Sequence, residues 1–203
     1  MTPQWKALLE EGADSDPFVQ FGRWFKDAAA VVPSPEAMAV ASADLQARPS
    51  VRMVLMKAWD EDGFVFHTHF ESRKGHELTE NPHASLLFYW EPLGRQVRIE
   101  GPVNRISDKE SDAYFLTRPA GGRVGAYASH QSQIIDSREA LDLQVQRIES
   151  QFVGHQVTRP PWWGGLRVQP QVFEFWQNRE DRLHDRLRYT PDRAGWKVER
   201  LQP

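Results

Sequence analysis

Three side chains near the C-terminus are of the right types to bind an anion together. Arg182, His184 and Arg186 occupy alternate positions of a segment that predicts a β-strand over 182–189. Side chains alternate between the two faces of a strand, so these three would share one face while Leu183 and Leu187 point toward a core. A solvated strand face has the same pattern, because charged side chains are usually exposed. By itself the segment does not distinguish an anion site from a solvated face. It indicates an anion site only if other segments of the chain also supply anion-binding residues.

Two further segments are suited to phosphate. Arg52 and Lys57 stand at the two ends of an apolar strand, and Ser72 precedes Arg73 and Lys74 at a predicted helix start. Helix starts favour anions through their free N–H groups and the helix dipole. Cations there oppose the dipole unless an anion lies between them, which favours a bound phosphate. For the two strand ends, the alternative is side chains that simply reach solvent.

Other polar positions carry weaker signals. Gln96 begins a predicted strand, where its amide would face either solvent or a planar heterocycle. Tyr114 and Arg118 lie four apart on a predicted helix and so share one face, which suits a second phosphate but is also a common surface pair. His67 and His69 alternate in a strand, yet no carboxylate, cysteine or third histidine stands at ligand spacing. We therefore expect no metal site.

The composition is that of an ordinary globular chain. Its 203 residues, 40% hydrophobic and 26% charged, suffice for one core, and we expect a single domain over 1–203 with a flexible segment at 1–15. The net charge of −3 gives no reason to expect nucleic acid or a membrane surface as a partner. Cysteine is absent, which excludes disulfides and thiolate chemistry. No apolar run approaches a membrane span or leader, so we expect a cytoplasmic protein.

Short strands dominate the predicted elements. Helices are expected to begin at Asp16-Pro17, Ser72, Ser107 and Ser137, each with a capping residue. The last of these has an apolar stripe from Leu141 to Phe152, and we expect it to be the best-defined helix. Strands are expected at 37–42, 51–58, 64–68, 84–90, 95–100, 165–169, 172–177, 182–189 and 196–201. The pattern predicts a mainly β (α+β) fold in which helices surround one barrel-like sheet.

Several motifs in this order resemble one family, the flavin-dependent pyridoxamine/pyridoxine 5′-phosphate oxidases. The resemblance runs from about Asp16 to Pro203. Its markers are Arg52-Met53-Val54-Leu55-Met56-Lys57, Ser72-Arg73-Lys74-Gly75, Arg95-Gln96-Val97, Tyr114 with Arg118-Pro119, Gln131-Ser132, Trp163-Gly164-Gly165, Glu174-Phe175-Trp176-Gln177 and Arg182-Leu183-His184-Asp185-Arg186. It implies an FMN-binding split β-barrel with peripheral helices, working as a homodimer whose flavin sites are each built from both subunits.

The resemblance also implies roles for individual residues. FMN would be bound by Arg52, Met53, Val54, Leu55, Lys57, His67, Thr68, Ser72, Arg73, Lys74, Gln96, Gln131, Ser132, Trp176 and Arg186. The substrate would be bound by Lys57, Tyr114, Arg118 and the position of Gly122, with Arg182 and His184 as catalytic residues beside its pyridine ring. The implied reaction converts pyridoxamine or pyridoxine 5′-phosphate to pyridoxal 5′-phosphate, with dioxygen as acceptor, hydrogen peroxide as by-product and ammonia released from the amine.

Three departures from the family pattern limit what the resemblance implies. His67 stands where the family usually has tyrosine, which alters a contact expected near the flavin phosphate, and Gly122 stands where the family has a serine that binds the substrate phosphate. A lost hydrogen bond to a charged group costs about 1.5–3 kcal/mol. In addition, Met1 to Ala13 do not match the basic, tyrosine-containing segment that closes over the substrate in some members.

Two other functions are compatible with these motifs. One is a related FMN-dependent oxidase of another substrate, of the phenazine-pathway type. The other is a non-catalytic FMN- or pyridoxal-phosphate-binding protein, which the joint presence of Lys57, Tyr114, Arg118, Arg182 and His184 argues against. The preference between amine and alcohol substrates, the turnover rate and the existence of a second pyridoxal-phosphate site are not determined by the sequence.

Overall fold

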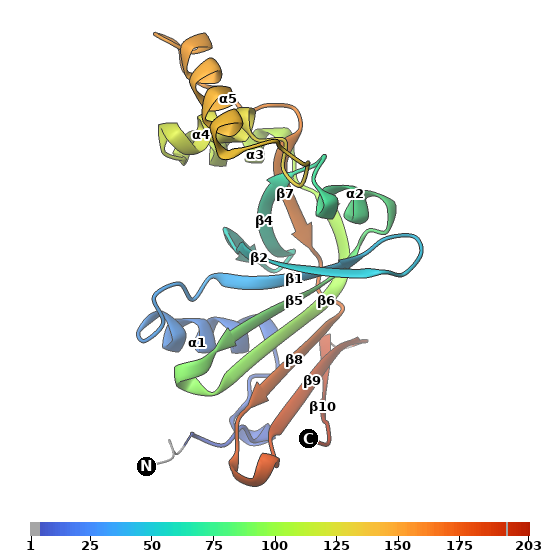
Figure 1. Ribbon diagram of the computed structural model, residues 1–203. Coiled ribbons are helices and arrows are strands. Elements are labelled where there is room, and N and C mark those ends of the chain that lie inside the picture. The colour runs from blue at the N-terminus through green and yellow to red at the C-terminus, as the bar shows by residue number, and fades with distance from the viewer. Residues whose placement is uncertain (1–4, 194) are drawn as a thin grey trace.

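The computed structural model describes residues 5–193 and 195–203, and in them an antiparallel sheet carries helices at one end and on one face (Figure 1). The main path through the sheet is β10-β9-β8-β6-β5-β1-β2, while β7 joins β6 to β4 and β4 pairs with β3. The strands are β1 (Ala37–Ala43), β2 (Pro49–Leu55), β3 (Ala58–Asp60), β4 (Gly63–His69), β5 (His83–Trp90), β6 (Arg95–Arg105), β7 (Trp163–Val168), β8 (Val172–Gln177), β9 (Asp185–Asp192) and β10 (Gly195–Arg200). The strand pattern predicts this barrel-like sheet with surrounding helices, and the family resemblance implies its split-barrel form.

The long strand β6 curls the sheet because its two halves pair with different partners. Residues Arg95–Glu100 pair with β8, and Val103–Arg105 pair with β7. Gly101 stands at the change of partner, where an added Cβ would lie 1.8 Å from the Gln169 carbonyl oxygen. Only glycine allows this close approach of two backbones.

The predicted strand 51–58 is divided in the structure. It ends at Leu55, and β3 begins at Ala58. Between them the Met56 N–H donates to the Glu36 carbonyl and the Lys57 N–H to the Val65 carbonyl, so the chain passes from one part of the sheet to the other. Lys57 therefore stands at the corner of the barrel instead of within a strand.

Helix α1 (Pro17–Ala29) covers the core face of the sheet, and the Asp16 side chain caps it by accepting from the Phe18 N–H. Phe21 is fully buried and makes edge-to-face contacts with Trp59, Phe64 and Phe88 at ring distances of 4.9–5.2 Å. Such aromatic contacts stabilise a core beyond the apolar area that they bury. The helical spacing of these aromatic residues correctly predicted a helix, and this helix packs its aromatic side chains into the core.

The remaining α-helices are α2 (Arg73–Glu80), α3 (Asp108–Thr117), α4 (Ala120–Ala128) and α5 (Arg138–Gln151). Ser72, Ser107 and Ser137 cap α2, α3 and α5 as expected. Three short 3₁₀ helices occur at Glu10–Gly12, Glu91–Leu93 and Glu180–Arg182. Helix α5 forms, but none of its residues is fully buried, and its apolar stripe only packs against the edge of a small cluster around Phe115 and Trp163. The apolar stripe of α5 is therefore less buried than its amphipathic pattern predicts.

Strand β9 begins later than predicted. Glu180–Arg182 form a 3₁₀ turn in which Asp181 and Arg182 have φ of 53° and 62°, and β9 starts only at Asp185. Leu187 is fully buried as expected, but Leu183 is 67% exposed. The prediction that Arg182, His184 and Arg186 share one strand face was therefore wrong, because left-handed backbone interrupts the alternation.

The N-terminal segment makes specific contacts in its described part. Leu8 is buried in the main core, and its N–H donates to Asp185 Oδ2 at 3.1 Å. Arg200 pairs with Glu10, and the Tyr189 hydroxyl donates to the Asp14 carbonyl at 2.8 Å. The segment 1–15, expected to be flexible, is thus held to the sheet through Leu8, Glu10 and Asp14, and residues 1–4 lie outside the described part. None of the described helices combines the length and apolar character needed to cross a membrane.

Candidate active site

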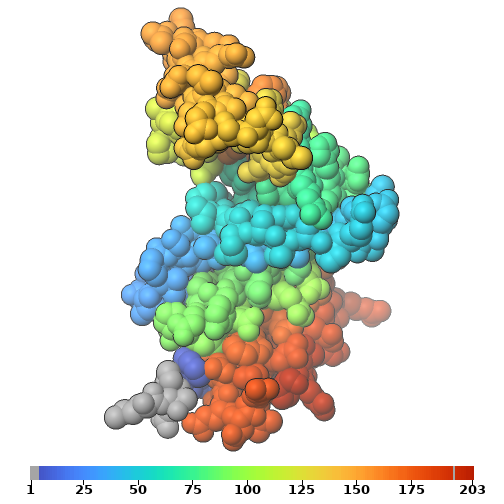
Figure 2. All heavy atoms as spheres, in the orientation of Figure 1, coloured from blue at the N-terminus to red at the C-terminus, as the bar shows by residue number. Residues whose placement is uncertain are grey.

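A cavity of about 750 Å³ lies between β2, β4 and the helices α3 and α4. Figure 2 shows the surface hollowed between the yellow helical part and the cyan segment that includes β2. Most of the predicted site residues line it: Arg52, Met53, Val54, Leu55, Lys57, His67, Thr68, Arg73, Lys74, Tyr114, Arg118, Gly122, Gln131 and Ser132. The fold brings them together from strands, helices and a loop that are far apart in the sequence.

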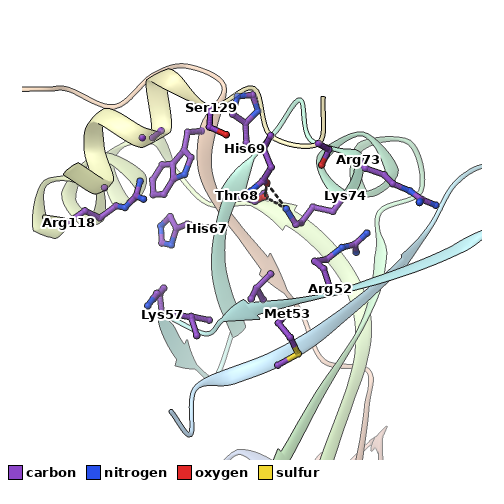
Figure 3. A pocket seen from close by; sticks show the side chains of 18 of the residues that line it. Arg52, Met53, Lys57, His67, Thr68, His69, Arg73, Lys74, Arg118 and Ser129 are labelled. Carbon is purple, nitrogen blue, oxygen red and sulfur yellow. Dashed lines mark hydrogen bonds between the residues drawn. The ribbon is translucent and has the colours of Figure 1, made fainter. Parts of the chain in front are cut away.

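One end of the cavity is cationic through Arg52, Arg73 and Lys74 (Figure 3). The Lys74 ammonium donates to Gln131 Oε1 at 2.6 Å and to Thr68 Oγ1 at 3.0 Å. Burial, together with the positive charge of Arg52, lowers the pKa of Lys74 to about 8. A buried cation of this kind gains most from a bound anion, so this end suits a phosphate.

Ser72 takes part only indirectly. Its hydroxyl accepts from the Gly75 N–H at 3.2 Å and donates to the His69 carbonyl at 2.6 Å, and the side chain does not line the cavity. It therefore holds the start of α2, on which Arg73 and Lys74 stand.

The opposite end of the cavity combines cations with stacked rings. Lys57 and Arg118 lie on either side of His67 (Figure 3). The His67 ring stacks on Tyr114 at 3.9 Å, and the Arg118 guanidinium lies 4.8 Å from the centre of the Trp163 ring. Within the described residues, Arg118 Nη1 and both ring nitrogens of His67 are buried and have no hydrogen-bond partner. These orphaned groups point to a polar ligand.

His67 is neutral at this end. Burial, then the positive charges of Arg118 and Lys57, lower the pKa of its imidazole to about 4. The position of His67 does not favour the expected contact with the flavin phosphate. Its ring stacks on Tyr114 and lies apart from Arg73 and Lys74. Its ring fills space between two cations without adding a third charge.

A second group of predicted residues lies outside the cavity. Gln96, Trp176 and Arg186 are successive partners across β6, β8 and β9, and the His184 ring lies 4.5 Å from the Trp176 ring. Arg186 donates to Glu174 Oε1 at 2.7 Å. Strands β5 and β1 separate β6 from β2, so this group and Arg182 do not reach the cavity of the same chain.

Sequence reasoning missed several residues in and around the site, and Trp163 and Glu77 are the two with the clearest structural roles. Trp163 lines the cavity between His67 and Arg118, and although it belongs to a recognised motif it received no role. Glu77 lies behind the cationic end and pairs with Arg52 and Arg73. The available signal was its helical spacing, since Glu77 shares a face of α2 with Lys74 and Leu78, and a core-facing carboxylate requires cationic partners.

The fold also assembles a group that sequence spacing did not show. His69, Glu71 and His130 place potential ligand atoms within 4.8 Å of one another. The argument that no carboxylate or third histidine is near was therefore incomplete. His69 Nδ1 accepts from the Glu71 N–H at 3.1 Å, so in the neutral ring its Nε2 carries the proton. While this bond stands, His69 has no lone pair for a metal, and the absence of a metal stays a prediction.

Comparison with known proteins agrees with this geometry. Residues 25–152 match the family model described as pyridoxamine 5′-phosphate oxidase. The chain belongs to this family. Residues 163–203 match a second model, the pyridoxine 5′-phosphate oxidase C-terminal dimerisation region.

Within the oxidase family, the chain is 56% identical over 198 residues to the pyridoxine/pyridoxamine 5′-phosphate oxidase of Bordetella petrii, covering 97% of this chain and 93% of that protein. It is 53% identical over 197 residues to the enzyme of the same name from Rubrobacter xylanophilus, covering 97% and 91%.

Solved structures share the fold of this oxidase-family chain. PhzG from Burkholderia lata, in complex with tetrahydrophenazine-1-carboxylic acid, has a TM-score of 0.90 and 37% identity over 98% of this chain and 99% of that chain. A pyridoxamine 5′-phosphate oxidase-related, FMN binding protein from Nostoc punctiforme has a TM-score of 0.72 at 16% identity, covering 94% and 100%, and shows the fold alone.

Proposed function

We propose that this chain is an FMN-dependent oxidase that converts pyridoxamine or pyridoxine 5′-phosphate to pyridoxal 5′-phosphate. The observation that carries the proposal is the cavity with cationic groups at both ends. One end would hold the flavin phosphate and the other the substrate phosphate. The names of the relatives at 53–56% identity support the same reaction.

The residues at the first end fit FMN. Arg73 and Lys74 offer charge-assisted hydrogen bonds to its phosphate, and Arg52 lies beside them (Figure 3). Bound FMN would supply the redox chemistry, as acceptor of a hydride from the substrate, with dioxygen as the final acceptor and hydrogen peroxide as the by-product. The chain contributes position and charge.

The residues at the second end fit the substrate. Lys57, Tyr114 and Arg118 would bind its phosphate, and Arg118 Nη1, which has no hydrogen-bond partner among the described residues, would be a donor to that phosphate. Holding both phosphates fixes the distance between the reacting carbon and the flavin, which is the main contribution that a protein makes to such chemistry.

We propose that a second copy completes each site. Gln96, Trp176, His184 and Arg186 do not reach the cavity of their own chain, and β7 to β10 lie within the match to the dimerisation region. Val51 and Met53 on β2 line the cavity and are exposed in the single chain, and Ile134, two positions after the lining residue Ser132, is 100% exposed. A homodimer would cover them and bring His184 and Arg182 of one subunit to the cavity of the other. The cytoplasmic location stays a prediction from the sequence.

Anaerobic mixing tests the activity. The FMN-loaded protein is combined with pyridoxine 5′-phosphate without oxygen while the visible flavin absorption is followed, and air is then admitted. Bleaching, then recovery with formation of pyridoxal 5′-phosphate and peroxide, is the expected result. Binding of FMN without bleaching by either pyridoxine or pyridoxamine 5′-phosphate would favour another substrate, such as a reduced phenazine carboxylic acid. Failure to bind FMN would overturn the proposal.

FMN affinity should depend on pH through Lys74. Its pKa of about 8 in the free protein rises when the phosphate dianion binds, so binding takes up a proton once the free ammonium has lost it. We expect the Kd for FMN to be lowest near pH 7, where the phosphate is mostly a dianion and the ammonium is still charged, and to increase as pH rises above about 8. Lys74→Arg, which stays charged, should remove the dependence between pH 7 and 9. Fluorescence titration of the flavin measures both, and an equally steep slope in the variant would assign the proton to another group.

Gly122→Ser should improve substrate binding. An added Cβ at this position would lie 3.5 Å from Arg118 Nη2, an ordinary contact, so serine fits beside the guanidinium. A new hydroxyl donor to a phosphate is worth about 1.5–3 kcal/mol, and we expect the KM for pyridoxine 5′-phosphate to fall by about tenfold or more. Gly121→Ser, on a neighbouring position with open space, is the control. An unchanged KM in the first variant would mean that the glycine loop already supplies the contact.

A further inference from the structure

Glu77 is the buried acid behind the cationic end of the cavity. It is 4% exposed, and its carboxylate accepts hydrogen bonds from the Ser42 and Ser50 hydroxyls at 2.5 Å each. It also accepts from Arg52 Nη2 at 3.2 Å and from Arg73 Nε at 2.8 Å. Burial raises the pKa of Glu77, but these four hydrogen bonds outweigh it and lower the pKa to about 2. The carboxylate is therefore ionised at neutral pH.

The contacts of Arg52 leave it little to offer a ligand. Nη1 donates to the Val40 carbonyl at 3.1 Å and to Ser42 Oγ at 2.7 Å, and Nη2 donates to the Ser50 hydroxyl and to Glu77. Each amino group of a guanidinium has two hydrogens, so both groups are fully used. Only the Nε–H remains for an anion.

Arg73 has the opposite arrangement. Its Nε donates to Glu77 Oε1, and its side chain is 61% exposed. Within the described residues neither of its amino groups donates a hydrogen bond, so both are available to an anion. One buried carboxylate thus holds two arginines in different orientations.

We propose that Glu77 is the positioning residue of the flavin-phosphate site, orienting Arg73 to present its two amino groups and Arg52 its Nε–H. This inference rests on the proposed function, because it takes the phosphate at the Arg52, Arg73 and Lys74 end to be that of FMN. Glu77 itself does not line the cavity.

The direction in which Glu77→Gln changes the Kd for FMN shows whether Glu77 orients the arginines or acts only through its charge. A carboxylate near a phosphate is repulsive, so if only net charge matters, Glu77→Gln should bind FMN more tightly. If Glu77 orients the arginines, the same variant should bind FMN more weakly, because two long side chains must then be ordered by the ligand.

The experiment compares FMN with riboflavin, which lacks the phosphate. Each is titrated into the flavin-free protein and followed by flavin fluorescence. We expect Glu77→Gln to raise the Kd for FMN by about tenfold and to leave the Kd for riboflavin unchanged. Glu80→Gln, an exposed acid on the same helix, is the matched control and should change neither. Unchanged or tighter FMN binding, or an equal loss for both flavins, would overturn the inference.

Two more variants show whether an effect of Glu77→Gln could come from misfolding and whether the flavin phosphate binds at this end of the cavity. Ser50→Ala removes one donor to Glu77 and one acceptor for Arg52 while leaving the charges paired, and should weaken FMN selectively by a few-fold. Lys74→Met tests the site itself. If it removes the preference for FMN over riboflavin while Glu77→Gln and Ser50→Ala do not, the site stands and the inference falls. If Lys74→Met also leaves the preference for FMN over riboflavin intact, the flavin phosphate does not bind at this end of the cavity. In that case the placement of FMN in the proposed function and the inference about Glu77 are both wrong.

Discussion

Replacing Arg118 with methionine is expected to raise the KM for pyridoxine 5′-phosphate by about a hundredfold and to leave the affinity for FMN nearly unchanged. A charge-assisted hydrogen bond contributes about 1.5–3 kcal/mol, and each 1.4 kcal/mol is a factor of ten. Methionine keeps an apolar side chain against Trp163 and Phe115, which the guanidinium now covers. FMN is spared because Arg118 lies at the opposite end of the cavity from Lys74 (Figure 3).

Steady-state kinetics with phosphorylated and unphosphorylated pyridoxine measures this effect. Wild-type enzyme should discriminate strongly between the two, and Arg118→Met should lose most of that discrimination. Arg147→Met, an exposed arginine on α5, controls for the loss of a positive charge. A variant that keeps its preference for the phosphorylated substrate would show that Arg118 does not bind this phosphate.

Replacing His184 with alanine is expected to lower kcat by about a hundredfold while the protein stays yellow. Its Nδ1 accepts from the Arg179 N–H at 3.2 Å, which directs the Nε2–H away from the backbone, and its ring lies against Trp176. A positioned proton donor or acceptor contributes typically 10²–10⁴-fold to a rate. Single-turnover bleaching of the flavin measures the chemical step directly.

The flavin content after gel filtration decides what His184 contacts. Full retention of FMN with slow bleaching would place it on the substrate side, whereas loss of the yellow colour would place it on the flavin. His155→Ala, an exposed histidine near the end of α5, is the control and should have no effect on either measurement.

Mixing these two impaired variants, assayed at a substrate concentration below the KM of Arg118→Met, tests whether the sites are shared. If Arg118 and His184 act in the same site but come from different subunits, a hybrid of Arg118→Met and His184→Ala has one intact site. Random exchange would restore about a quarter of the wild-type activity, because half of the dimers are hybrids with one of two sites complete. No recovery after subunit exchange would contradict the division of the site that the separation of the two residue groups indicates.

Local chemistry in the sequence determined where most elements begin. Asp16, Ser72, Ser107 and Ser137 all cap helices as predicted, because a cap is a contact between residues two or three positions apart. Apolar alternation likewise located the strands of the central sheet. The motifs recognised in the sequence also name most of the cavity lining. None of these features depends on how distant segments meet.

Helix α4 shows where local reasoning ends. It contains three glycines and has no side-chain cap at Pro119, so its own residues disfavour a helix. It forms because Val124 and Ala126 are buried against Phe115 and Trp163. In the same way, the left-handed turn at Arg182 moved the start of β9 and ended the shared strand face on which the first anion-site prediction depended.

The sequence by itself determined the family, the helix starts and the chemical character of the site. Only the tertiary structure decided that the predicted residues fall into two groups separated by β5 and β1, that His67 stacks on Tyr114, and that Glu77 holds Arg52 and Arg73 together. The physical reason is the range of the interactions. Caps and alternation act within a few residues, whereas ion pairs, stacking and strand order depend on contacts between segments that the chain brings together only on folding.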